Sequence, residues 1–152
     1  MSYSAYLKRI SEIRKVLYPV QYQQKLRSQS PEIRPGEDGK GNFIVRTPGR
    51  PYVKRGEKPR GIVFCDDSFF VFYEKWSIKE DQLLSYKYHY QKSGAEYWSM
   101  RYDMEEWEKP GHPKHHLQIS VLDELLDKAL RLPTGEVRCE EVIEAISQQL
   151  VH

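Results

Sequence analysis

Two stretches of sequence, LLSYKYHYQ at residues 83–91 and WSMRYD at residues 98–103, decide the fold that we predict. Apolar residues occupy every second position in most of both stretches, and polar residues stand between them. This period of two is typical of β-strands that bury one face, and the KSGA segment at residues 92–95 can form the turn between them. We therefore predict a β-hairpin with one apolar face and one polar face. The polar face carries Ser85, Lys87, His89, Gln91, Ser99, Arg101 and Asp103.

The aromatic pattern also predicts how the two strands pair. Placing Tyr88 opposite Met100 brings the aromatic residues of both strands together and sets His89 beside Ser99. A slip of one residue would turn the aromatic side chains onto the polar face. We therefore expect the pattern itself to fix this register.

Helical periodicity marks both ends of the chain. Apolar residues within the first 17 positions recur three and four residues apart, and Pro19 makes Tyr18 the expected end of this helix. Residues 121–130 and 142–150 show the same spacing on either side of a Pro-Thr-Gly break. We predict two C-terminal helices from them.

The middle of the chain favours strands. Residues 61–65 (GIVFC) and 69–76 (FFVFYEKW) are rich in β-branched and aromatic residues and flank a turn-forming DDS segment. With the hairpin they predict an α+β fold, a mainly antiparallel sheet of about four to six strands with an N-terminal helix and two C-terminal helices. We assign residues 1–152 to a single domain. Its parts are an N-terminal helical segment (1–33), a basic Gly/Pro-rich loop (34–60), a β core (61–119) and C-terminal helices (120–152).

Composition excludes several classes of protein. The mean hydropathy is −0.75, and no apolar stretch approaches the ~20 residues that span a bilayer, so we expect no membrane association. The N-terminus lacks the apolar core of a secretory signal, and the two cysteines, Cys65 and Cys139, show no metal-ligand spacing. We therefore expect a cytoplasmic protein with reduced thiols and no cofactor.

The small net charge of +2 conceals a basic segment. Residues 34–60 contain eight Lys or Arg against three Asp or Glu, whereas residues 121–152 are acidic. The segment is rich in Gly and Pro, so a long helix is excluded, although residues 43–45 could pair as a short strand. It is either a solvated loop or an electrostatic arm for phosphate groups. The residues that we predict to bind nucleic acid are Arg46, Arg50, Lys54, Arg55 and Lys87.

Three of the five histidines lie within GHPKHH at residues 111–116. Histidine titrates near neutral pH, so such a cluster can supply an acid and a base, or neutral nitrogens for a metal ion. Carboxylates just upstream, at residues 103, 105, 106 and 108, could add a metal ligand, although the spacing matches no established metal motif. Alternatively, the histidines only form hydrogen bonds that attach a loop to the sheet.

Together with the polar strip, the histidines suit cleavage of RNA. One group would deprotonate the 2′-hydroxyl, another would protonate the leaving 5′-oxygen, and an arginine would stabilise the charged phosphorane. We predict no metal ligand for this chemistry. The predicted catalytic residues are His89, Arg101, Asp103, His112, His115 and His116, with Asp103 orienting a histidine or the arginine.

The motifs YKYHYQ (86–91), RYD (101–103) and HPKHH (112–116), with a closing helix around EVI (141–143), resemble the TumE-like toxin family of prokaryotic toxin–antitoxin systems. The resemblance covers residues 61–150 and implies a toxin that acts on RNA and pairs with a DNA-binding antitoxin. The sequence departs from the family pattern at Met104, where Asn is usual, and at Leu117 and Gln118, where a further His is common.

Two alternatives remain open from the residues. The chain could be a non-catalytic module that binds nucleic acid or protein through its basic segment. It could instead be a metal-dependent hydrolase built on the histidine cluster.

Overall fold

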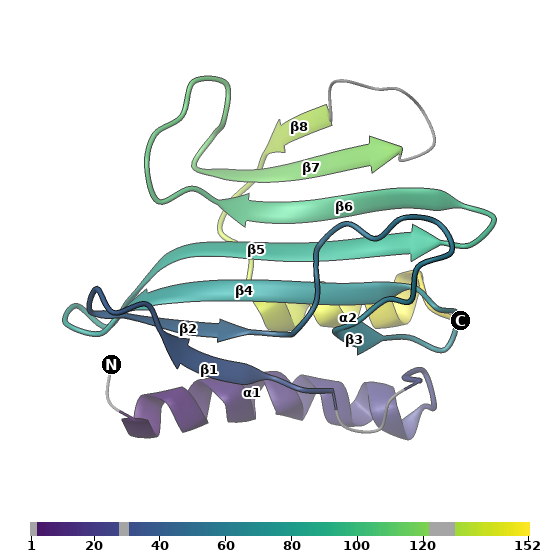
Figure 1. The fold of residues 1–152 in the computed structure, drawn as a ribbon, viewed down its shortest axis with the longest axis horizontal. Helices are drawn as coiled ribbons and strands as arrows, with labels where there is room; N and C mark the ends of the chain where they lie inside the picture. The colour runs from purple at the N-terminus through teal and green to yellow at the C-terminus, as the bar shows by residue number, and fades with distance from the viewer. Residues whose placement is uncertain (1–2, 28–30, 122–129) are drawn as a thin grey trace.

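An antiparallel sheet and two helices make up the described part of the chain (Figure 1). The computed structural model describes residues 3–27, 31–121 and 130–152. The helices are α1 (Tyr3–Tyr22) and α2 (Cys139–Gln149). The strands are β1 (Arg34–Glu37), β2 (Asn42–Arg46), β3 (Ile62–Val63), β4 (Phe69–Ser77), β5 (Gln82–Ser93), β6 (Tyr97–Met104), β7 (His115–Val121) and β8 (Leu130–Pro133).

The strands form one sheet in the order β1-β2-β4-β5-β6-β7-β8, and every pair is antiparallel. From β4 to β8 each strand pairs with the next one in the chain, which makes this part a meander. Strands β2 and β3 pair with different parts of β4, at residues 73–77 and 69–70. The DDS turn between β3 and β4 is present, as the sequence predicts, with Asp67 at a positive φ of 67°.

The two faces of the sheet differ in the way that the alternation predicts. Tyr86, Tyr88 and Tyr90 are at most 1% exposed and pack with apolar residues of α1 and α2. Residues 47–61 cross the opposite face, in front of β4 and β5 in Figure 1. There the backbone of Val53 donates to the Gln91 side-chain oxygen at 3.3 Å and accepts from its amide nitrogen at 2.6 Å. The polar face is therefore partly covered by chain rather than fully open.

A buried charge network joins the helices to the sheet. Nε and Nη2 of Arg9 donate to the two carboxylate oxygens of Glu74 at 2.8 and 2.7 Å, and Nη2 also lies 2.7 Å from Glu140. Tyr88 donates its hydroxyl to Glu74 at 2.7 Å. Burial opposes the charge on Arg9, but the hydrogen bonds to both carboxylates raise its pKa above the ordinary value. The network therefore holds α1, β4 and α2 together through paired charges.

The prediction of about four to six strands with two C-terminal helices is wrong. The described residues contain eight strands and one helix after the sheet, α2. Most of the helix predicted at residues 121–130 lies outside the described residues, but Val121 ends β7 and Leu130 begins β8. Residues 34–46, assigned to a loop apart from a short strand at residues 43–45, form the hairpin of β1 and β2, and the expected short strand is part of β2. Short strands escape prediction because four or five residues carry too little periodicity.

Two further details differ from prediction. Tyr88 pairs with Tyr102 rather than Met100, and His89 pairs with Arg101 rather than Ser99, a shift of two residues. The period of two fixes which face a residue occupies, but a shift of two preserves the faces, so the turn decides the register. The N-terminal helix continues past Pro19 to Tyr22, with Pro19 inside its last turn.

Of the residues that the structure describes, neither helix combines the length and apolar character that a membrane-spanning helix needs.

Candidate functional site

The polar face of the sheet brings predicted residues from three strands into two adjacent rows. In one row Lys87 of β5, Asp103 of β6 and His116 of β7 lie opposite one another. In the next row His89 pairs with Arg101, and Arg101 pairs with Gln118. Neighbouring strands lie ~4.8 Å apart, so Lys87 and His116 stand about 10 Å from each other at the backbone.

Asp103 connects Arg101 and His116. Its carboxylate lies 2.9 Å from Nε of Arg101 and 3.3 Å from Nε2 of His116. The other ring nitrogen of His116, Nδ1, donates to the carbonyl of Pro113 at 2.9 Å. Both Asp103 and His116 are buried, whereas the Arg101 side chain is 18% exposed. Arg101 is thus the member of this group that can reach a ligand, and Asp103 holds it in place.

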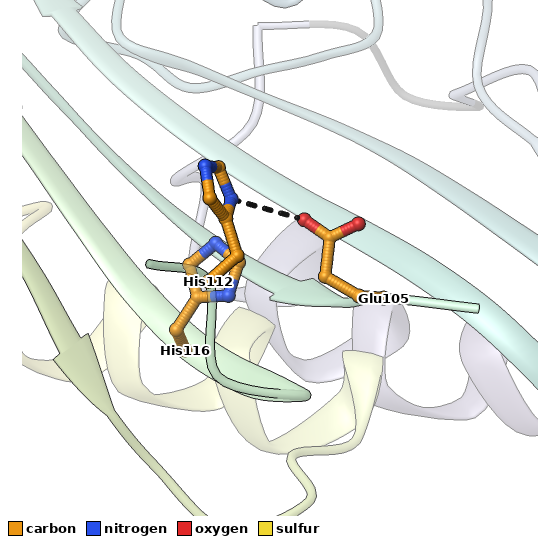
Figure 2. A group of neighbouring side chains, drawn as sticks. All are labelled: Glu105, His112 and His116. Atoms are coloured by element: carbon orange, nitrogen blue, oxygen red, sulfur yellow. Dashed lines mark ion pairs between the residues drawn. The ribbon is translucent and has the colours of Figure 1, made fainter. Parts of the chain in front are cut away.

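His112 stands at the edge of the same group on a tight turn. Lys109 and His112 close the turn with a backbone hydrogen bond of 3.0 Å, and Gly111 adopts a φ of +74°. Pro followed by Gly with positive φ is typical of a type II turn. Nδ1 of His112 lies 3.4 Å from Oε1 of Glu105, and Figure 2 shows the other ring nitrogen pointing away from that carboxylate. A carboxylate at one nitrogen and space at the other is an arrangement suited to acid–base chemistry.

Glu105 keeps its negative charge beside the histidines. Partial burial opposes ionisation, but contacts with Lys109, His116 and His112 lower the pKa of Glu105 below its ordinary value. Its second oxygen, Oε2, lies 3.1 Å from Nζ of Lys109. Glu105 therefore faces His112 as a carboxylate.

His115 does not join the other two histidines of the cluster. It precedes His116 on β7, so its side chain points to the helix-covered face, where Nδ1 is hydrogen-bonded to the Tyr86 hydroxyl at 3.0 Å. Burial lowers the pKa of His115 below its ordinary value. Strand alternation thus divides the predicted cluster, leaving His112 and His116 on the side of Arg101 and Asp103.

His89 lies on the polar face, but the crossing segment, which contains Tyr52, covers it. The side chain is 1% exposed, and the Tyr52 ring stands edge-on at 4.7 Å between centroids. Neither ring nitrogen makes a hydrogen bond of normal geometry within the described residues. Burial lowers the pKa of His89 to about 3, and the nearby Arg101 charge adds to the effect while a weak contact with Gln91 opposes it. His89 is therefore a neutral imidazole and no proton donor at neutral pH.

A basic groove of about 530 Å³ runs between the polar face and residues 46–51. Lys75 pairs with Glu106 at 2.9 Å, while Arg46 and Lys87 have no ion-pair partner among the described residues. Cations without partners in a hollow favour a polyanionic ligand. The charged residues lining the groove are Arg34, Arg46, Lys75, Lys87 and Glu106, and Tyr73 and His89 also line it.

The other predicted nucleic-acid-binding residues do not line this groove. Arg50 is 80% exposed at its side chain and lies 3.5 Å from Glu57, and Lys54 is exposed. Arg55 donates to the backbone carbonyl of Gly94, and its guanidinium lies 4.5 Å from the centroid of the Tyr97 ring. The basic segment thus contributes Arg46 to the groove, whereas Arg55 fastens it to the turn between β5 and β6.

Sequence reasoning missed Arg34, Tyr73, Lys75 and Glu106 as residues of the groove. Tyr73 and Lys75 alternate with buried residues of β4, and Tyr73 pairs directly with Lys87. The alternation could have placed both residues on the polar face. The pairing of β4 with β5 was needed to place them beside Lys87.

A second hollow, of about 740 Å³, adjoins the histidines. It is formed by residues 105–110 and 112–114, which include Glu105 and His112. Glu106 lines both hollows. The basic groove and the histidine-lined hollow therefore meet at one side chain.

Comparison with protein families gives a match. Residues 44–150 match the family model described as Toxin TumE, and this range includes β3 to β8 and most of β2 but not β1. No curated protein and no solved structure matches the chain.

Proposed function

The chain belongs to the TumE toxin family, and from this premise we propose that it is a toxin that cleaves RNA by metal-independent acid–base chemistry. The observation that carries the proposal is the basic groove that meets a carboxylate-linked histidine on one sheet face. As a toxin, the protein requires a cognate antitoxin as its partner.

The groove supports the choice of RNA. Arg46 and Lys87 offer two positive charges that no described residue neutralises, and the phosphate backbone of RNA is the polyanion that such charges bind. Single-stranded RNA is favoured because the ring of Tyr73 lines the groove, and Tyr52 of the crossing segment is a further exposed aromatic residue.

The acid–base assignment follows from exposure. His112, 29% exposed at its side chain and held by Glu105, is the base that takes the 2′-hydroxyl proton. The 2′-oxygen then attacks phosphorus, and the bond to the 5′-oxygen breaks. Arg101 stabilises the phosphorane charge, and Lys87 supplies the proton that the leaving 5′-oxygen needs. Asp103 and His116 act as positioning residues because they are buried.

A second candidate is RNA binding without cleavage. It is favoured by the burial of His116 and by the existing bonds of Arg101 to Asp103 at 2.9 Å and to Gln118 at 3.4 Å, which occupy the guanidinium. In this alternative the groove alone defines the activity.

The test uses the purified full chain and a fluorescent single-stranded RNA, with EDTA present throughout. We expect cleavage to fall about 100-fold or more in His112→Ala. Lys87→Ala is expected to weaken RNA binding and to lower the slope of log K against log salt concentration by about one. Two surface variants outside the site, His152→Ala and Lys15→Ala, serve as matched controls and are expected to behave as the wild type.

The same RNA with a single 2′-deoxynucleotide at the cleaved position should resist cleavage if the 2′-oxygen is the nucleophile. Binding without cleavage in the wild type would reject the ribonuclease and support the second candidate. Equal cleavage by the wild type and His112→Ala would reject His112 as the base.

A further inference from the structure

Glu105, His112 and His116 offer three ligand atoms that lie within 4.8 Å of one another (Figure 2). They come from the end of β6, the type II turn and the start of β7, so three segments converge on one point. Carboxylate oxygen and imidazole nitrogen are ordinary ligands of zinc and related divalent ions.

Two buried nitrogens in this group have no hydrogen bond among the described residues. They are Nδ1 of His112, which lies 3.4 Å from Oε1 of Glu105, and Nε2 of His116, which lies 3.3 Å from Oδ2 of Asp103; neither contact is a hydrogen bond. Buried polar atoms in folded proteins almost always have a hydrogen-bond partner. A buried nitrogen without such a partner therefore indicates a site that a water molecule or an ion can fill. Both of these nitrogens belong to the same cluster, so a single bound ion could satisfy both of them.

The distances fit a tetrahedral ion. Ligands at about 2.0–2.1 Å from such an ion stand roughly 3.4 Å from each other. Nδ1 of His112 and Oε1 of Glu105 are 3.4 Å apart. Lys109 contacts the other carboxylate oxygen, Oε2, at 3.1 Å, which leaves Oε1 available.

His116 already has the outer contact that a metal-binding histidine needs. Its Nδ1 donates to the Pro113 carbonyl at 2.9 Å, which fixes the proton on that nitrogen and leaves Nε2 as the ligand. Metal-bound histidines almost always donate their second nitrogen in this way. The side chain is fully buried, so the ring is held firmly in this orientation.

Access to the cluster is open on one side. Glu105 and His112 line the hollow of about 740 Å³, and both side chains are partly exposed. A metal ion can therefore enter from solvent, and a fourth position remains for water.

We propose that Glu105, His112 and His116 bind one divalent transition-metal ion, with zinc as the best match. Asp103 is not one of these three ligands; its carboxylate pairs with Arg101 and also lies 3.3 Å from Nε2 of His116. A metal on Nδ1 of His112 leaves the proton on Nε2, so that nitrogen can no longer accept one. If the proposed RNA cleavage holds, zinc would therefore inhibit it, because the metal-bound His112 can no longer act as the base.

The binding test needs no RNA. Untagged full chain, stripped with a chelator, is titrated with Zn²⁺ by calorimetry and with Co²⁺ by visible absorption, which reports coordination number. We expect one ion per chain with at least micromolar affinity, and a four- or five-coordinate cobalt spectrum.

His112→Ala and Glu105→Gln should each weaken Zn²⁺ binding by at least about tenfold. Glu108→Gln, an exposed carboxylate of the same loop, is the matched control and should bind as the wild type. Circular dichroism of each variant checks that the fold is retained, which matters because the cluster adjoins buried residues. Absence of Zn²⁺ binding in the wild type, or equal affinity in His112→Ala, would overturn the site.

The zinc-binding experiment and the RNA-cleavage experiment can fail independently of each other. Zinc binding in a protein that cleaves no RNA would leave the metal site standing and reject the ribonuclease. RNA cleavage in a protein that binds no zinc would reject the metal site and leave the ribonuclease standing.

Discussion

We predict that acid destabilises the protein through one buried imidazole, that of His89. The side chain is 1% exposed, and burial lowers its pKa to about 3. In the unfolded chain the same ring has an ordinary pKa of about 6.5. Between these values the unfolded chain binds a proton that the folded chain does not. The free energy of unfolding therefore falls as the pH drops below about 6.5.

The size of the effect follows from the difference between the two pKa values. Each pH unit inside that window lowers the free energy of unfolding by about 1.4 kcal/mol. Moving from about pH 7 to about pH 4.5 removes about 2.5 kcal/mol through His89 alone. For a protein of this size the loss corresponds to a fall in Tm of about 5–10 °C.

The assay is urea unfolding of the wild type and His89→Phe at both pH values. Phenylalanine keeps an aromatic ring against Tyr52 but cannot bind a proton. The carboxylates titrate alike in both proteins, so subtraction isolates His89. The wild type is expected to lose about 2.5 kcal/mol more than the variant. Equal losses would refute the reasoning, as would a His89 NMR signal that titrates above about pH 5.

Two other substitutions test the fold. Arg9→Met leaves Glu74 buried without its partner and should cost about 3–5 kcal/mol in urea unfolding, so a loss below about 1 kcal/mol would contradict the network. Gly61→Ala places a Cβ 2.6 Å from Val71 Cγ1 at a φ of +93°, and should cost about 2–4 kcal/mol. An unchanged Tm for Gly61→Ala would show that this crossing of the polar face tolerates a side chain.

The faces of the hairpin could be predicted from sequence, but its register could not. Alternation of Tyr86, Tyr88 and Tyr90 with Lys87 and His89 is a local pattern, and each residue lies on its expected face. The register depends on where the chain turns, because a shift of two residues buries the same faces. The turn brings Ser93 opposite Tyr97, a detail that the residue types between them do not decide.

The candidate site could also be predicted from the sequence only in part. Arg101 and Asp103 were predicted to share a face because they belong to one strand. The separation of His115 from His116 required knowing that β7 is a strand, and its short sequence next to Pro113 did not show it. The burial of His89 depends on Tyr52, 37 positions earlier in the chain, and no local pattern carries that contact.

The placement of α1 and α2 on one face of the sheet has a consequence for synthesis on the ribosome. The meander from β4 to β7 pairs neighbours in the chain, so these strands can associate as soon as they emerge. The tyrosine face gains its last apolar cover, Ile143, Ile146 and Val151, only when the end of the described chain is made. Until those residues are made, α1 is the only one of the two helices that can cover the aromatic side of the paired strands.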